Sequence, residues 1–293
     1  MTQITQGGKV LKNRARAIAD YCRVPLDKLF TAAPPEQLNS NTIRKTQHML
    51  SALLSKAVQK GIIRFNPMLN TEPIKAQRIP ATVMNNEQAQ LFKRLLKGVE
   101  NINVRALLMT ALCTGMRSGE LRALQWEDVD TQRGIINVNK NLDNKNRITT
   151  PKTKSSTRYV NMIELLPEFL EHYHNELQAY ITAMHGRVAD NGIVFPAITT
   201  GEYMNSSYPN KVIKQLIRGT ELPQDLHIHS LRHTFTSLMI NSGADAKVVQ
   251  TTLGHSSVST TQDIYSHVFA ETLAKSMKRV GRALTDGNDI FGK

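Results

Sequence analysis

The sequence predicts a mainly α-helical protein with one small antiparallel β-sheet. Apolar residues recur at the helical spacing i, i+3, i+4 and i+7 along most of the 293 residues. Stretches rich in β-branched residues, which read as strands, are confined to residues 133–143 and 149–162. Residues 65–82 carry three prolines and no periodicity, as an interdomain linker would. We therefore expect a small helical domain over residues 1–78 and a larger, mostly helical domain after the linker.

The first strong helical pattern covers residues 41–61, with Asn41 as the expected N-cap and Gly61 as the expected stop. Its apolar stripe consists of Ile43, Leu50, Leu53, Leu54, Ala57 and Val58. We expect this stripe to pack while the opposite face meets phosphates, although an ordinary solvated face explains each basic residue there equally well. The basic side chains off the stripe are Arg44, Lys45, Lys56 and Lys60.

The second part of the chain opens with a helix that begins near Asn85 or Asn86 and ends at Gly98. Residues 104–115 are apolar on nearly every side and predict a buried helix. The two strand stretches, separated by the polar turn 144–146, predict one antiparallel hairpin. Further helices are expected over residues 163–186, 206–219, 229–243, 245–254 and 260–284.

The charge balance favours a nucleic-acid partner. The net charge is +13 and the isoelectric point is near 9.8. Residues 1–78 hold 13 Lys and Arg against four acidic residues, a net charge of +9. The alternative is a basic protein that its charge merely keeps soluble.

Other sequence features argue against secretion and a membrane span. No apolar run reaches the roughly 18 residues of a membrane span, and the N-terminus lacks the apolar core of a secretory signal. Cys22 and Cys113 fit neither a disulfide framework nor a zinc cluster, so a reducing cytoplasm is expected.

Residues 227–234 read HIHSLRHT and gather three histidines and an arginine. His229 and His233 have the spacing of a zinc protease motif, but Ser230 stands where that motif needs a glutamate. The His–Ile–His sequence at 227–229 has the form found in metal-dependent relaxases, although here it opens a helix rather than lying on a strand. His229 and Arg232, spaced i, i+3 at a helix start, suit a phosphate better than a metal because a guanidinium repels a cation.

Four ordered segments bring cationic residues to this pair: residues 114–130, 229–235, 253–261 and 263–268. They read TGMRSGELRALQWEDVD, HSLRHTF, LGHSSVSTT and DIYSHV, and together they closely resemble the tyrosine recombinase family, also called phage integrases. The resemblance covers residues 83–270 as the catalytic domain. Residues 41–67 also resemble the end of that family's helical core-binding domain, which would occupy residues 1–78.

The resemblance implies a catalytic set and a role for each member. Tyr265 would be the nucleophile, and Lys152 on the hairpin would protonate the leaving group, with Lys154 as its rival and as a DNA contact. Glu120 is expected to support the first arginine. The full catalytic set is Arg117, Lys152, His229, Arg232, His255 and Tyr265.

The same resemblance implies site-specific DNA cleavage and rejoining through a 3′-phosphotyrosine and a Holliday junction, integrating or excising a mobile element. It implies no metal and no other cofactor. The expected partners are double-stranded recombination sites, a homotetramer on DNA and DNA-bending accessory factors, at the nucleoid of a bacterial cell. Residues 271–293 would contact a neighbouring subunit.

The segment before the catalytic domain is shorter than in many integrases. A type IB topoisomerase and a non-catalytic DNA-binding protein are the alternatives.

Overall fold

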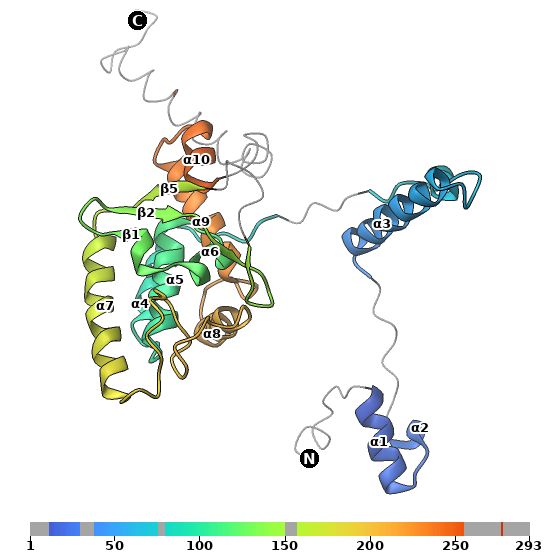
Figure 1. Ribbon diagram of the computed structural model, residues 1–293, viewed down its shortest axis with the longest axis horizontal. Coiled ribbons are helices and arrows are strands. Elements are labelled where there is room, and N and C mark those ends of the chain that lie inside the picture. Colours follow the sequence, from blue (N-terminus) through green and yellow to red (C-terminus); the bar gives the residue numbers. More distant parts are fainter. Residues whose placement is uncertain (1–11, 30–37, 76–79, 150–156, 255–276, 278–293) are drawn as a thin grey trace, which may run out of the picture. The chain divides into compact units, whose positions relative to one another are not determined.

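The computed structural model describes residues 12–29, 38–75, 80–149, 157–254 and 277 (Figure 1). The chain divides into two compact units, Met1–Ile79 and Pro80–Lys293. More than half of the described residues are helical, and among them the small antiparallel sheets lie in the second unit, so the predicted fold class is confirmed.

Within residues 12–29 and 38–75, the first unit shows three helices and one turn of 3₁₀-helix. These elements are α1 (Lys12–Cys22), α2 (Leu26–Leu29), α3 (Ser40–Gln59) and η1 (Pro67–Asn70). The sequence pattern predicted α3 but missed α1 and α2, whose short apolar stripes give weak periodicity. η1 lies inside the predicted linker. It is held to α3 by Asn66, whose side-chain nitrogen donates to Ser51 O (3.0 Å) and to Ser55 Oγ (2.9 Å).

The two ends of α3 show which local signals were interpreted correctly. The prediction of Asn41 as N-cap is wrong, because Asn39 caps the helix by accepting a hydrogen bond from the Asn41 amide at 2.8 Å. The predicted stop is confirmed. Gly61 has φ +71° and donates to Val58 O, while Ile62 donates to Ala57 O. These two bonds form a Schellman ending, which requires the left-handed conformation that glycine adopts freely.

The expected packing of the α3 apolar stripe is only partial among the described residues, where Leu54, Ala57 and Val58 are half-buried. No residue of α3 is buried. Ile43, Leu50 and Leu53 remain 37%, 41% and 66% exposed. Period alone predicted an amphipathic helix, but it could not say what would cover its apolar face.

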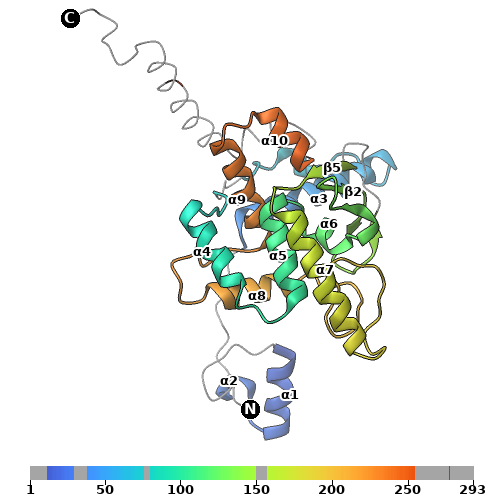
Figure 2. The same cartoon turned by 90° about the vertical axis from the view of Figure 1, so that its left-hand side faces the viewer.

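The larger of two hydrophobic clusters in the described part of the second unit is built around α5 (Ile102–Thr114). α5 contacts α7 (Leu166–Ala183) and α9 (Ile228–Asn241), and Figure 2 shows it between these two helices. Leu107 and Leu108 of α5 are fully buried, as the all-round apolar pattern predicted. The other helices among the described residues of this unit are α4 (Asn86–Leu96), α6 (Ser118–Ala123), η2 (Trp126–Asp128), α7 (Leu166–Ala183), α8 (Tyr208–Ile217), α9 (Ile228–Asn241) and α10 (Ala246–Leu253).

The start of α4 follows a local sequence signal. Asn85 accepts from the Gln88 amide at 2.8 Å, and the Gln88 side chain accepts from the Asn85 amide at 3.0 Å. This reciprocal capping box satisfies amides that the helix itself leaves without partners. The predicted start near Asn85 or Asn86 is confirmed.

The predicted antiparallel pairing of the two strand stretches is confirmed, but they pair in two sheets rather than in one continuous hairpin. β1 (Val129–Asp130), β2 (Ile135–Val138) and β5 (Arg158–Asn161) make one antiparallel sheet in the order β1-β2-β5, and β3 (Asn141–Leu142) pairs with β4 (Ile148–Thr149). At the break after β2 the chain contacts η2. Asn139 and Lys140 turn to Asp128, with nitrogen–oxygen distances of 2.6 Å and 3.1 Å.

In the described part of the chain, no helix is both long and apolar enough to span a membrane.

Candidate functional site

The turn after α5 brings two predicted site arginines together. α5 ends at Gly115, whose φ is +63°. A Cβ on Gly115 would lie 2.5 Å from Cδ1 of Phe235 and 2.9 Å from Cδ2 of Leu253, so only glycine fits. The Gly115 carbonyl accepts a hydrogen bond from Nη1 of Arg232 at 2.8 Å. Two residues further on, Arg117 stands immediately before α6.

Arg117 is held by Glu120 of the same helix. Its Nη1 donates to Oε1 of Glu120 at 2.9 Å, and its backbone amide donates to Oε2 at 2.8 Å. Its other terminal nitrogen, Nη2, donates to the Gly254 carbonyl at 3.1 Å. The Arg117 side chain is still 39% exposed, so it is anchored on one side and open to a ligand on the other.

Glu120 also binds a second arginine, which was missed in the sequence analysis. Arg158 of β5 donates from Nη1 to Oε1 at 3.0 Å and from Nη2 to Oε2 at 2.9 Å. Its Nε donates to the Thr252 carbonyl at 2.9 Å. Along β5 the buried positions are Arg158 and Val160, in strict alternation with exposed ones. A charged residue in phase with a buried valine was therefore the available signal for this inward-facing cation.

The pKa of the Glu120 carboxyl reflects this double pairing. Burial by itself favours the protonated acid and raises the pKa. The hydrogen bonds and positive charges of Arg158 and Arg117 outweigh burial and lower the pKa to about 2. Glu120 is therefore a carboxylate throughout the neutral range.

Arg232 lies in the first turns of α9 and is only 3% exposed. In addition to the bond to Gly115, its Nη2 donates to the Leu253 carbonyl at 2.8 Å. Three successive carbonyls, those of Thr252, Leu253 and Gly254, thus accept hydrogen bonds from three different arginines. These arginines come from β5, α9 and the start of α6.

The end of α10 explains why arginines gather there. The last carbonyls of a helix have no partner within it and carry partial negative charge. The Gln250 and Thr251 carbonyls accept from the Gly254 amide, and the arginines satisfy the ones that follow. Gly254 has φ +65°, a left-handed ending that turns the chain toward residue 255.

Three histidines line the start of α9 beside these arginines. The rings of His229 and His233 meet edge to face, with centroids 4.8 Å apart, and those of His227 and His229 are 6.5 Å apart. Partial burial of the ring, followed by the positive charges of Arg232, His227 and Arg117, lowers the pKa of His229. Burial also lowers the pKa of His233, to about 4. Both rings are neutral at pH 7, so His229 can accept a proton.

The structure thus groups Arg117, His229 and Arg232 of the predicted site. The other predicted members, Lys152, Lys154, His255 and Tyr265, lie outside the described residues. Within the described ranges, no group of three or more His, Cys, Asp and Glu side chains is placed to hold a metal ion.

The basic residues predicted to meet DNA on α3 are accessible. Arg44, Lys45, Lys56 and Lys60 are all exposed. Arg44 makes a local contact, with its Nε 3.4 Å from Nε2 of His48.

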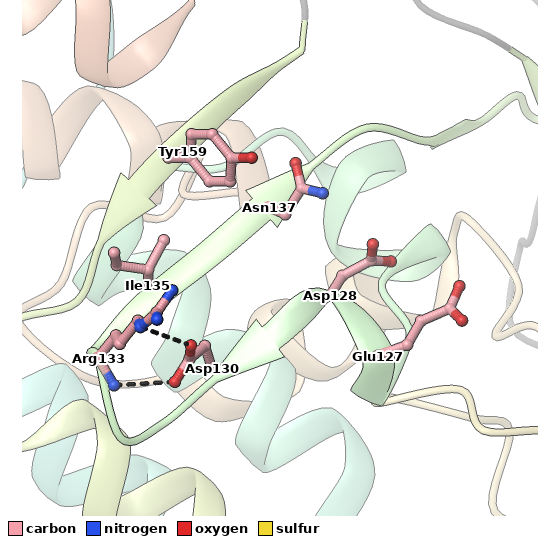
Figure 3. A pocket seen from close by; sticks show the side chains of 7 residues that line it. All are labelled: Glu127, Asp128, Asp130, Arg133, Ile135, Asn137 and Tyr159. Carbon is pink, nitrogen blue, oxygen red and sulfur yellow. Dashed lines mark hydrogen bonds and ion pairs between the residues drawn. The ribbon is translucent and has the colours of Figure 1, made fainter.

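A separate pocket opens on the other face of the β1-β2-β5 sheet (Figure 3). The exposed ring of Tyr159 borders it, whereas its strand neighbours Arg158 and Val160 are buried. Asp130 closes one end by accepting a hydrogen bond from the Arg133 amide at 2.8 Å. No predicted site residue lines this pocket.

Comparisons with known proteins agree with the sequence motifs. Residues 82–272 match the phage integrase family. The chain is 30% identical over 259 residues to tyrosine recombinase XerC of Pediococcus pentosaceus, covering 82% of this chain and 79% of that protein. It is 28% identical over 235 residues to the ICEBs1 integrase of Bacillus subtilis, covering 79% of this chain. It spans only 63% of the length of that integrase.

Solved structures share the fold. The Tn1549 transposon integrase in complex with a circular intermediate DNA matches with a TM-score of 0.66 and 22% identity, over 95% of this chain and 97% of that one. A lambda integrase dimer bound to a COC′ core site matches with a TM-score of 0.57 and 16% identity, over 87% and 73% of the two chains. With the family match extending over most of the chain and a relative at 30% identity, the protein belongs to the phage integrase family, the family of the tyrosine recombinases.

Proposed function

We propose that this protein cleaves and rejoins DNA at specific sites through a covalent bond between Tyr265 and a 3′-phosphate. The observation that carries the proposal is the convergence of Arg117 and Arg232 on the adjacent carbonyls of Gly254 and Leu253. This anchoring fixes two guanidiniums beside the imidazole of His229. A fixed pair of cations of this kind fits the negative charge that develops on a phosphodiester under attack.

The first step joins tyrosine to DNA. The phenolic oxygen of Tyr265 attacks phosphorus, and the bond from phosphorus to the 5′ oxygen breaks. A tyrosine has an ordinary pKa of about 10, so the attack needs a proton acceptor or a cationic surrounding. His229 takes this proton, and its lowered pKa keeps it neutral and able to do so. His255, directly after Gly254, donates a hydrogen bond to the phosphate.

The departing 5′ oxygen receives a proton from Lys152, with Lys154 as the alternative donor in the same segment. One ester bond to phosphorus replaces another, so the step needs no external energy source, metal or redox partner. A 5′-hydroxyl from a second strand reverses the chemistry and releases Tyr265. Two such exchanges pass through a Holliday junction and integrate or excise a mobile element.

The partners follow from this chemistry and from the relatives. Two double-stranded sites cut in turn require four active sites, so we propose a homotetramer on DNA, with DNA-bending accessory factors. The Tn1549 and lambda integrases named above are bound to DNA in their structures. In this chain, residues 1–78 would clamp the DNA through α3, residues 83–270 would carry the chemistry, and residues 271–293 would contact a neighbouring subunit.

A suicide DNA substrate, nicked so that the cleaved end diffuses away, tests the proposal. Incubation in EDTA followed by a denaturing gel should give a covalent protein–DNA adduct with the unaltered protein and none with Tyr265→Phe. An adduct that forms only with added metal would instead indicate a relaxase. Relaxation of supercoils without site preference would indicate a topoisomerase, and DNA binding without any adduct would indicate a non-catalytic protein.

A further inference from the structure

Arg158 is a buried cation whose three kinds of donor nitrogen are all engaged. Nη1 and Nη2 bind the two oxygens of Glu120, and Nε binds the Thr252 carbonyl. Its side chain is only 6% exposed, against 39% for Arg117. With all three kinds of nitrogen bound within the protein, Arg158 directs its contacts at the parts of the protein that hold Arg117.

The charges explain why a second arginine is needed at Glu120. A carboxylate paired with Arg117 alone would cancel the charge of that arginine and draw its guanidinium inward. With Arg158 on the same carboxylate, the group of three side chains carries one net positive charge. The surplus lies with Arg117, the member of the group that is open to solvent.

Arg158 also joins three parts of the proposed site. It lies on β5, directly after the segment that holds Lys152, and it contacts α6 through Glu120 and the end of α10 through Thr252. The backbone of Gly254 packs against the Arg158 side chain, because a Cβ on Gly254 would lie 3.0 Å from Cδ and 3.1 Å from Nη1 of Arg158. The Arg158 side chain thus contacts the residue directly before His255.

We propose that Arg158 is a positioning residue for DNA cleavage: it sets the guanidinium of Arg117 through Glu120 and holds the end of α10 from which His255 follows. This inference rests on the proposed function, since it assigns Arg158 a part in the same reaction. Arg158 itself does not touch the phosphate.

The test compares Arg158→Met and Arg158→Lys with Arg105→Met. Arg105 is the control because it also donates to both oxygens of one carboxylate, Glu176, at 3.1 Å and 3.0 Å, in an ion pair that is more exposed, at 28% and 37%. We expect Arg158→Met to slow single-turnover adduct formation on the suicide substrate about 100-fold, the loss expected for a displaced catalytic group. Arg158→Lys keeps the charge without the three-donor geometry, so its rate should fall between the two. Arg105→Met should cleave at the unaltered rate.

Two further measurements separate positioning from folding. DNA affinity, measured in a Tyr265→Phe background, should be the same with and without Arg158→Met. Amide hydrogen exchange should become faster over residues 114–121 and 246–254 in Arg158→Met but not in Arg105→Met. A wild-type cleavage rate in Arg158→Met would overturn the inference. So would a loss of cleavage that is proportional to the loss of thermal stability in Arg158→Met and Arg105→Met alike.

The exchange measurement also keeps the two proposals apart. If the unaltered protein forms no adduct, the proposed function fails and the role of Arg158 in cleavage fails with it. The exchange rates then decide only whether Arg158 holds the two segments in place, and unchanged exchange over both would overturn that too. If the unaltered protein forms the adduct and Arg158→Met matches it, the function stands and only the inference about Arg158 fails.

Discussion

Arg158 and Glu120 form a bidentate ion pair between β5 and α6, with nitrogen–oxygen distances of 3.0 Å and 2.9 Å and both side chains 6% exposed. Removing two such charges from water is costly, and their mutual attraction repays that cost only with good geometry and further hydrogen bonds. Both conditions are met here, because Arg117 and the Thr252 carbonyl satisfy remaining donors and acceptors.

A double-mutant cycle should reveal this coupling. Arg158→Met leaves Glu120 with one cation fewer, and Glu120→Gln leaves two arginines without their carboxylate. Breaking one side of a buried pair costs roughly 3–5 kcal/mol of unfolding free energy. The double variant should therefore cost clearly less than the sum of the single ones, as measured by urea unfolding of the full chain. Strict additivity would show that the two side chains act independently.

The stability difference between the unaltered protein and Glu120→Gln should depend on pH. The pKa of Glu120 in the folded protein, about 2, lies below its usual value of 4.5. A carboxyl with a lowered folded pKa contributes stability above its unfolded pKa and loses it as pH falls toward the folded pKa. The shift corresponds to about 3 kcal/mol at neutral pH. Melting curves should converge between about pH 4.5 and pH 2, and a gap that stays constant over this range would contradict the assignment.

The cleavage rate should fall at low pH because His229 becomes protonated there and can no longer accept a proton. Partial burial and the charges of Arg232, His227 and Arg117 lower its pKa, so its neutral, proton-accepting form persists below the ordinary histidine value of about 6.5. Single-turnover cleavage should therefore be lost only at a pH lower than that value. His229→Gln should be slower at pH 7 and should lack this fall at low pH. The same fall in His229→Gln would assign the titration to another group.

The basic face of α3 should contribute to DNA affinity through phosphate contacts. Each contact adds about −0.9 to the slope of log affinity against log salt. Lys45→Ala and Lys56→Ala together should therefore flatten the slope by about two, as measured by fluorescence anisotropy with duplex DNA. Lys214→Ala is a suitable control. Lys214 lies on α8, which is at the opposite end of the second unit from α10 and the arginines of the proposed site (Figure 1). Equal slopes in the unaltered protein and the double lysine variant would exclude these phosphate contacts.

Helices and their ends were largely predictable because their determinants are local. The burial of α5 and the capping box of Asn85 and Gln88 each depend on residues close together in the sequence. Asn39 and Asn41 show the limit of this reasoning, because either side chain could have capped α3 and only the backbone geometry decides between them. The strands were found, but the contact of Lys140 with Asp128 at the break between the two sheets joins residues 12 positions apart.

The site was predictable in its members but not in its construction. Motif spacing identified Arg117, His229 and Arg232. The capping of the α10 end by Arg158, Arg232 and Arg117 joins residues separated by 94, 21 and 137 positions. Such contacts depend on which arginines lie next to the unpaired carbonyls at a helix end in the folded protein, and the periodicity of the sequence does not predict this.

The most direct test of the account is to identify the residue that becomes joined to DNA. The adduct formed on the suicide substrate in EDTA can be digested with nuclease and protease and its peptides sequenced by mass spectrometry. The account predicts a nucleotide attached through its 3′-phosphate to Tyr265, together with a free 5′-hydroxyl on the released strand. Attachment at any other residue, or a released 5′-phosphate, would contradict it.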